Sequence, residues 1–190
     1  MIYSVGSIFL DHIIKIDNFP KKPVKVIAQG IEKRLGGSAA VASFTIKKLG
    51  LNTSFIGRLG DDDVSKYLKN ELSKFNIEHK DVIFIKGAQS SQSYVYEDKT
   101  GERLLAAFSE KKLLNNKKLP KIEFTKNTTF ITDLRWVEAT HYIAKHCQKK
   151  KLNQIVDLDN YKLNTKVKQI INMSSHPIFS ETGSFEYTKI

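Results

Sequence analysis

Strand-like and helix-like segments alternate along most of this 190-residue chain, and the alternation limits the folds that it can adopt. The clearest helical pattern lies in residues 64–75, where Val64, Leu68 and Leu72 recur every four residues behind an acidic first turn. The expected helices span 38–49, 64–75, 137–150 and 163–172, and the expected sheet strands span 2–7, 53–57, 82–86, 129–132, 154–158 and 177–180. This order predicts an α/β fold with a doubly wound, mostly parallel sheet.

Two stretches, about 13–34 and 91–108, do not fit this rhythm. Residues 24–34, 91–98 and 103–108 have the mixed faces of half-exposed strands, and a turn-rich connection, Lys-Thr-Gly-Glu, joins the last two. We therefore expect a small β lid attached to the parallel sheet. Residues 115–126 form a polar connector.

The basic charge of the chain invites comparison with nucleic-acid-binding proteins. The formal net charge is +11, yet only four of the 31 basic residues are arginines, and the lysines are scattered. Short lysine clusters are not interleaved with the aromatic residues on which single-stranded bases stack. We expect a solvated lysine-rich surface and no nucleic-acid partner.

Other features of the composition exclude several classes of protein. With 41% hydrophobic and 27% charged residues, the chain has an ordinary globular composition. It has neither the unbroken apolar run that a membrane span needs nor the start of a secretory signal. Cys147 is the only cysteine, and the five histidines show no metal-binding spacing. We expect a cytoplasmic protein that does not bind a membrane.

A glycine pair, Gly36-Gly37, stands between an expected strand and the helix 38–49. Glycines at this position allow a ligand to approach the backbone and present amide groups at the helix N-terminus. The alternative is a tight turn without a ligand. Ser38 either adds a hydroxyl to such a site or caps the helix, and capping is the more common role.

A longer motif surrounds this pair. From Gly36 to Gly60 the chain reads GGSAAVASFTIKKLGLNTSFIGRLG, preceded by Asp11 and followed by a Gly-Asp-Asp turn and a Gly-Glu-Arg turn. This pattern resembles the N-terminal signature of the ribokinase-like (PfkB-type) carbohydrate kinases, and the resemblance extends over nearly the whole chain. It implies phosphoryl transfer from ATP, with Mg²⁺, to a sugar hydroxyl.

The resemblance also implies roles for particular residues. Asp11 would accept hydrogen bonds from sugar hydroxyls, and Gly36 and Gly37 would let the sugar approach the backbone. Gln92 and Arg103 would reach the sugar from the lid, although solvated strand positions are the slightly favoured alternative. Asp157 and Asp159 end a strand and either line the cleft or have a structural role. Taken together, the resemblance implies that the chain is the substrate-binding side of a kinase.

Within this family, the stretches GRLGDDD, SSQS and DLRW are similar to those of bacterial 6-deoxy-6-sulfofructose kinases. The likeness implies that Lys25 and Arg135 bind a sulfonate, whereas Ala107 replaces an asparagine of that binding set. Arg135 also follows a predicted parallel strand, where open α/β sheets bind ligands, and a guanidinium can grip two oxygens of an anion. The alternative is an ion pair with Glu138 or Asp133.

The chain departs from the family pattern in places. Val41 replaces an asparagine that contacts the sugar, and Ser180 and Gly183 replace an Asn and a Glu near magnesium, leaving Glu181 as a weak substitute. The catalytic Gly-x-Gly-Asp does not occur in the 190 residues. We therefore interpret residues 1–190 as a C-terminally truncated, N-terminal part of a kinase domain without its nucleotide-binding part, and expect no turnover.

The sequence leaves two other functions open. With Val41 in place of a polar residue, the acceptor could be a nucleoside or another alcohol. The chain could also be a non-catalytic module that binds a ligand or dimerises. Pairing of two lids is common in the family, so the resemblance favours a homodimer formed through the β lid.

Overall fold

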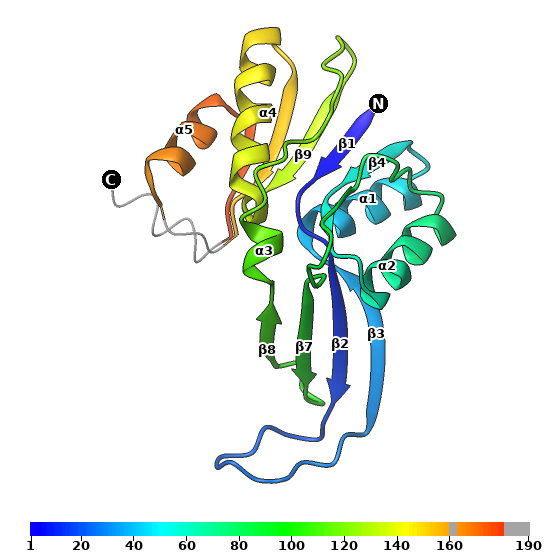
Figure 1. The fold of residues 1–190 in the computed structure, drawn as a ribbon. Coiled ribbons are helices and arrows are strands. Elements are labelled where there is room, and N and C mark those ends of the chain that lie inside the picture. The colour runs from blue at the N-terminus through cyan, green and yellow to red at the C-terminus, as the bar shows by residue number, and fades with distance from the viewer. Residues whose placement is uncertain (160–162, 181–190) are drawn as a thin grey trace.

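A parallel sheet forms the centre of the molecule in a computed structural model that describes residues 1–159 and 163–180. Its strands lie in the order β11-β10-β9-β1-β4, and every neighbouring pair is parallel. The strands are β1 (Ile2–Val5), β4 (Thr53–Ile56), β9 (Thr129–Asp133), β10 (Asn153–Asp157) and β11 (His176–Ile178). Strand β4 lies on one side of β1, and β9, β10 and β11 follow one another on its other side. This reversal of strand order at β1 confirms the doubly wound α/β prediction (Figure 1).

Helices cover both faces of this sheet. Figure 1 shows α4 (Val137–Lys150) and α5 (Thr165–Met173) on one side, and α1 (Ser38–Lys48) and α2 (Asp63–Lys74) on the other. Adjacent residues of β4 show how one strand serves both layers. Phe55 packs with the α1 and α2 side chains, whereas Ile56 packs with those of α4, because successive side chains of a strand point to opposite faces. Both side chains are fully buried.

The helix boundaries agree with the sequence prediction to within three residues. Helix α2 begins after Asp62, whose carboxylate accepts a 2.9 Å hydrogen bond from the Ser65 amide. This N-cap satisfies a backbone donor that the helix itself leaves unpaired. No helix of the described residues has the length and apolar character needed to cross a bilayer.

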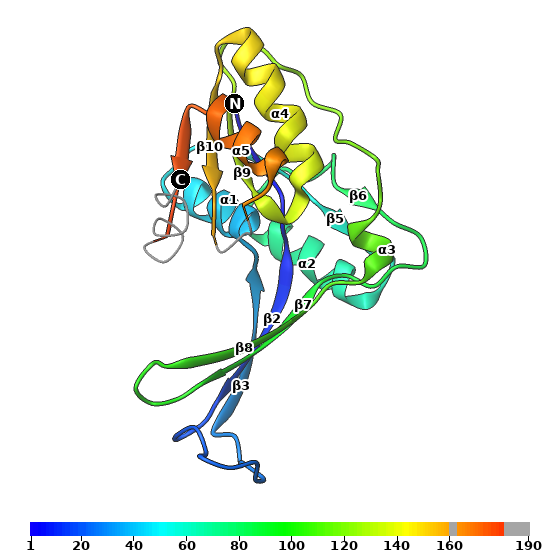
Figure 2. The same cartoon turned by 90° about the vertical axis from the view of Figure 1, so that its left-hand side faces the viewer.

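A second sheet projects from the parallel one, as Figure 2 shows. It has the order β3-β2-β7-β8, with β2 (Phe9–Lys15), β3 (Gly30–Gly36), β7 (Gln92–Glu97) and β8 (Arg103–Phe108). Strands β2 and β7 are parallel, whereas the two outer pairs are antiparallel. This sheet is the expected β lid, and we use that name for it below.

The boundaries of the lid differ from the prediction. Residues 24–29 were expected to begin a strand, but they are irregular, and β3 starts only at Gly30. Val24 and Ile27 are 64% and 76% exposed, so their apolar side chains lack the packing partners that favour a strand. Strand β2, which the sequence analysis missed, supplies the centre of the lid from residue 9 onward.

Smaller elements connect the two sheets. Strands β5 (Arg58–Leu59) and β6 (Ile83–Phe84) form a short parallel pair, so the strand expected over 82–86 is mostly irregular. A short helix, α3 (Lys111–Leu114), was not expected. Beyond α3, residues 115–128 run without helix or strand toward β9, in agreement with the predicted polar connector.

The single cysteine belongs to the core. Cys147 is buried on α4, and burial raises the pKa of its thiol to about 12. A thiol that stays protonated in an apolar environment is a small hydrophobic group rather than a nucleophile. Cys147 therefore contributes to packing.

Candidate functional site

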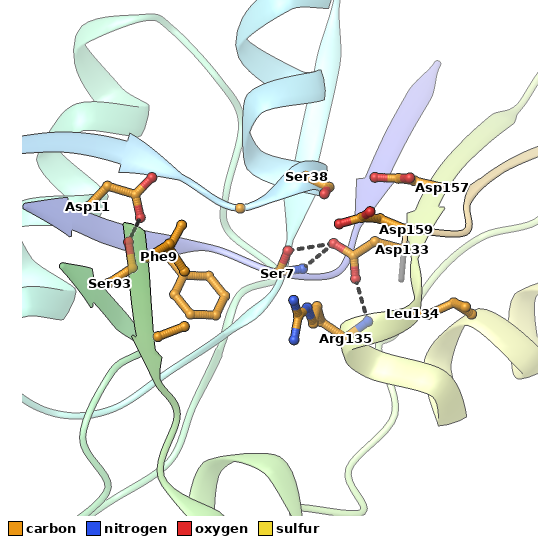
Figure 3. A pocket seen from close by; sticks show the side chains of 13 residues that line it. Ser7, Phe9, Asp11, Ser38, Ser93, Asp133, Leu134, Arg135, Asp157 and Asp159 are labelled. Atoms are coloured by element: carbon orange, nitrogen blue, oxygen red, sulfur yellow. Dashed lines mark hydrogen bonds between the residues drawn. The ribbon is translucent and has the colours of Figure 1, made fainter. Parts of the chain in front are cut away.

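Polar residues gather where the parallel strands end. Ser7 follows β1, Asp133 ends β9, and Asp157 ends β10, so the three lie along one edge of the sheet (Figure 3). The lid adds Phe9, Asp11 and Ser93 from the opposite side, and a cavity of about 150 Å³ lies between the two groups. We call it the acceptor cavity. Its position at the carboxyl ends of parallel strands is the one at which open α/β sheets bind ligands.

Asp133 joins three segments of the cavity wall. One oxygen of its carboxylate accepts hydrogen bonds from the Ser7 amide (2.8 Å), the Ser7 hydroxyl (2.6 Å) and the Ala39 amide (3.2 Å). The other oxygen accepts a bond from the Arg135 amide at 2.9 Å. Burial raises the pKa of Asp133, and the bonds from Ser7, Arg135 and Ala39 oppose this shift. Asp133 thus holds these three segments together by hydrogen bonds.

Asp11 is held in place by the lid. Its side chain accepts a 2.5 Å hydrogen bond from the Ser93 hydroxyl on the neighbouring strand β7. Gly36 lies directly beside it, since a Cβ atom at residue 36 would stand 2.0 Å from the Asp11 carboxylate. Asp11 and Gly36 therefore form one continuous floor. The second carboxylate oxygen has no hydrogen bond within the described residues, so it is free to accept one from a ligand hydroxyl.

The glycine pair turns the chain from β3 into helix α1. Gly37 is the N-cap residue, and its φ of 92° lies in the region that glycine tolerates best. The amides of Ala39 and Ala40 donate to Asp133 and to the Ser7 carbonyl, so these two donors are already used by the protein. The main contribution of the pair is close approach of the backbone.

Ser38 lines the acceptor cavity at the first position of α1. The expectation that its hydroxyl caps the helix is wrong, because the N-cap is Gly37 and no side chain caps this end. Ser38 therefore presents its side chain to the cavity (Figure 3).

Arg135 lies in a short 3₁₀ turn, η1 (Leu134–Trp136), directly after β9. It lines the acceptor cavity, and its side chain is exposed. Neither expected ion pair forms: the Asp133 carboxylate binds the Arg135 backbone amide, and Glu138 pairs with Lys166 at 3.5 Å. The guanidinium remains without a carboxylate partner among the residues that the structure describes.

Three further candidates lie outside the cavity. Lys25 is exposed in the irregular segment between β2 and β3. Gln92 contacts His12 at 3.1 Å, on the lid face opposite Asp11 and Ser93. Arg103 pairs with Glu97 at 2.6 Å near the far end of the lid. The structure thus does not bring these side chains to the acceptor cavity.

Several cavity residues escaped the sequence analysis. Ser7, Phe9, Ser93 and Leu105 line the cavity, and Asp133 was considered only as a partner of Arg135. The signal for Asp133 was its place at the end of a predicted strand, whereas Ser93 is identified only by the lid register.

Other sequence candidates have different outcomes. Asp157 and Asp159 line the cavity, and so does Ala107, the alanine that departs from the sulfonate-binding set. Val41 is exposed on α1 and does not line it. Glu181 and Gly183 lie outside the described residues.

The described residues contain no cluster of metal-ligating side chains. Residues 1–159 and 163–180 contain no group of three or more His, Cys, Asp or Glu side chains arranged to hold an ion. The side chains of this part of the chain therefore do not fit a Mg²⁺ site by themselves.

The fold and the cavity can now be compared with known proteins. Residues 1–181 match the pfkB family of carbohydrate kinases. The chain belongs to that family. Its members include fructokinase-2 of Solanum lycopersicum, which is 27% identical over 103 residues that cover 54% of this chain and 30% of that protein. The ribokinase of Haemophilus influenzae is 24% identical over 105 residues, covering 55% and 34%.

Solved structures show the same fold. The nucleoside kinase of Methanocaldococcus jannaschii superposes with a TM-score of 0.80 at 18% identity, over 99% of this chain and 63% of that one. The ribokinase of Arabidopsis thaliana, solved with ribose and ATP, gives 0.75 at 19% identity, over 96% and 60%. This chain therefore has the ribokinase fold and spans less than two thirds of these relatives.

Proposed function

We propose that this chain is the acceptor-binding side of an ATP-dependent sugar kinase of the pfkB family. The observation that carries the proposal is the floor formed by Asp11 and Gly36, which lies across the acceptor cavity from Arg135. A carboxylate oxygen that is free to accept a bond suits sugar hydroxyls, which are hydrogen-bond donors. The absence of a side chain at residue 36 leaves room for the Asp11 carboxylate, and Gly37 presents a backbone without a side chain to the cavity, which lets a flat polyol lie close to it.

The preferred acceptor in this proposal is a ketose that carries an anionic end group, such as a sulfo-sugar. Arg135 is exposed to the cavity and has no carboxylate partner in the described chain. A guanidinium presents paired N–H donors that match two oxygens of a sulfonate or phosphate. With Asp11 at one side and Arg135 at the other, a hydroxyl-rich end and an anionic end would each find a partner.

Isothermal titration of the 190-residue chain with fructose, ribose, inosine and 6-deoxy-6-sulfofructose tests the proposal. We expect the sulfo-sugar to bind most tightly, and Asp11→Asn to weaken its binding by about tenfold or more through loss of charge-assisted bonds. Arg135→Ala should weaken the sulfo-sugar by a similar factor and fructose by less than about twofold. Binding of inosine alone would favour a nucleoside acceptor instead.

Arg103→Ala is the matched control, because Arg103 is an arginine of the lid that already pairs with Glu97. It should leave the affinity for each sugar unchanged. If no sugar binds, the sugar assignment is wrong. If Arg103→Ala weakens the sulfo-sugar and Arg135→Ala does not, the anion-binding role of Arg135 is wrong.

The phosphoryl donor has a different place in this proposal. The 190 residues contain no Gly-x-Gly-Asp, and the described part holds no metal-binding group. We propose that ATP and Mg²⁺ are bound by a part of the enzyme other than these residues, and that the chain alone transfers no phosphate. Here the residues of the chain only bind and orient the acceptor.

We also propose that two copies pair through the outer face of the lid, which is the face opposite Asp11. The strand register places five exposed apolar side chains on this face: Ile31, Tyr94, Tyr96, Leu104 and Phe108. Such a concentration of apolar surface on one side of a projecting sheet favours association. An identical lid would cover it in a symmetric dimer.

Light scattering coupled to size exclusion tests the dimer. We expect a particle of twice the 21.6 kDa chain mass, and a monomer for Leu104→Asp, because a charge on the covered face is costly. Leu49→Asp is the control, since Leu49 is also an exposed leucine but lies at the end of α1. A monomeric parent chain, or a dimer that tolerates Leu104→Asp, would contradict the proposal.

A further inference from the structure

A broad groove runs along the exposed side of α4, beside the acceptor cavity. Its walls are residues 114–119, the α4 positions from Val137 to Lys145, and Lys166 of α5, and its volume is about 1010 Å³. Both views show the chain that follows α3 running beside α4 (Figures 1 and 2). We call this hollow the outer groove. Small-molecule pockets measure about 300–1,000 Å³, so the outer groove has room for a complete metabolite.

The charges around the outer groove are strongly unbalanced. Five cationic side chains line it: Arg58, Lys117, Arg135, Lys145 and Lys166. The single carboxylate in the lining, Glu138, is paired with Lys166. None of the other four cations forms an ion pair within residues 1–159 and 163–180, where the lysines that do pair outside the groove are Lys15, Lys66, Lys74 and Lys80. The groove therefore carries positive charge that the described protein does not neutralise.

Arg58 is the least expected of these cations, because it is only 8% exposed. Its guanidinium donates to the Leu114 carbonyl at 2.8 Å and the Arg135 carbonyl at 3.2 Å, and lies 4.7 Å from the centre of the Trp136 ring. Burial lowers the pKa of Arg58. A charge removed from water is costly unless opposite charges lie nearby. Glu138 and Asp133 act on Arg58 through space and oppose the lowering of its pKa, but neither carboxylate forms an ion pair with it in the described chain.

Arg58 lies between the outer groove and a second, smaller chamber. Like Arg135, it lines both the outer groove and a smaller chamber that adjoins the acceptor cavity at Ser7 and Phe9. An anion in the outer groove would add a negative charge in contact with one side of this guanidinium. The buried cation is thus a second observation, independent of the exposed lysines, that indicates an anionic ligand.

The pKa of His141 is sensitive to the positive charge in the groove. Its pKa is lowered first by burial and then by Lys145, with a further contribution from Lys166, while Glu138 opposes the shift. The nearby walls are not purely polar, since Leu119, Val137 and Tyr142 also line the groove. Cations beside apolar and aromatic surface suit a ligand that has both phosphate groups and an organic body.

We propose that the outer groove is a second ligand site, which binds an organic phosphate with at least two negative charges. Its phosphate oxygens would contact Arg135, Lys145 and Lys166, and its organic part would lie against Tyr142 and Val137. Because Arg135 lines both hollows, an occupant of the outer groove shares a cation with the acceptor cavity. The ligand can be a sugar bisphosphate or a nucleoside diphosphate, which have this chemistry in common.

Isothermal titration of the 190-residue chain with fructose 1,6-bisphosphate and with ADP tests the site and separates the two sources. We expect saturable binding of at least one of them, weakened by added KCl because the contacts are partly screened. Lys145→Glu and Lys166→Glu should each reduce the affinity by about tenfold through loss of one charged contact and addition of a repulsive one. Lys145→Gln, which only removes the charge, should give a smaller loss.

Lys149→Glu and Lys168→Glu are the matched controls, since each lies on the same helix as its counterpart, is exposed and lies outside the groove lining. Each should change the affinity by less than about twofold. The proposal is overturned if neither compound binds. The proposal is also overturned if the groove substitutions and the control substitutions weaken binding equally. That pattern indicates a general charge effect or a ligand held in the acceptor cavity.

Discussion

Gly36→Ala should lower the sugar affinity of the chain by about 10- to 100-fold while leaving it folded, because a lost hydrogen bond to a charged group costs about 1.5–3 kcal/mol. The reason is that a Cβ atom at residue 36 would stand 2.0 Å from the Asp11 carboxylate. The carboxylate is the end of a flexible side chain, so it can turn away at small cost to stability. It then no longer lies where a sugar hydroxyl can donate to it. Isothermal titration and thermal unfolding of both proteins measure the two effects.

Gly30→Ala is the control for this substitution. Gly30 begins the same strand, β3, and a Cβ atom there would meet no atom within 4 Å. It should change neither affinity nor stability. The double variant Asp11→Asn/Gly36→Ala should bind no more weakly than Gly36→Ala alone, because both changes remove the same interaction. Fully additive losses would show that Gly36 acts by another route.

Asp133→Ala should reduce the free energy of unfolding by about 3–5 kcal/mol, the range found when one partner of a buried charged network is removed. The substitution leaves the Ser7, Ala39 and Arg135 amides without their acceptor, and Asp133 is only 3% exposed. Asp133→Asn keeps one acceptor oxygen but turns an NH₂ group toward another donor, so we expect an intermediate loss. Urea unfolding followed by the fluorescence of Trp136, the only tryptophan, gives these values.

Asp157→Ala is the matched control, because Asp157 ends the neighbouring strand β10 and lines the same cavity. No hydrogen bond from its side chain occurs within the described residues. Its loss should change the free energy of unfolding by less than about 0.5 kcal/mol, as for most exposed substitutions. Equal losses for the two aspartates would mean that the hydrogen-bond network of Asp133 is not what stabilises the site.

The sequence predicted the lid less well than the parallel sheet. Helix α4 was predicted with its observed bounds, because one face of it packs on the sheet and leaves a 3.6-residue pattern. Strand β2 leaves no comparable pattern. Its residues Asp11 and His12 are polar and half-buried, and its pairing with β7 joins positions about 80 residues apart. Such a register depends on contacts that are distant in the sequence.

The residues of the candidate site were likewise predicted only in part from the sequence. Asp11, Gly36, Gly37, Ser38 and Arg135 were found because their motif or their place after a strand marks them. Ser93, by contrast, is one serine among several until the β2–β7 register sets it against Asp11. Lys25, Gln92 and Arg103 were expected at the sugar, but strand alternation and the course of the lid direct them elsewhere.

The amino-acid sequence alone determined the α/β class, the order of helices and strands in the parallel sheet, and the resemblance to the kinase family, because periodicity and short motifs are local properties. Only the tertiary structure decided which polar groups lie together: the Asp133 network, Asp11 beside Gly36, and the cations Arg58 and Arg135 at the outer groove. These meetings depend on burial and on the register of strands far apart in the chain. Neither quantity can be read from the neighbours of a residue in the sequence.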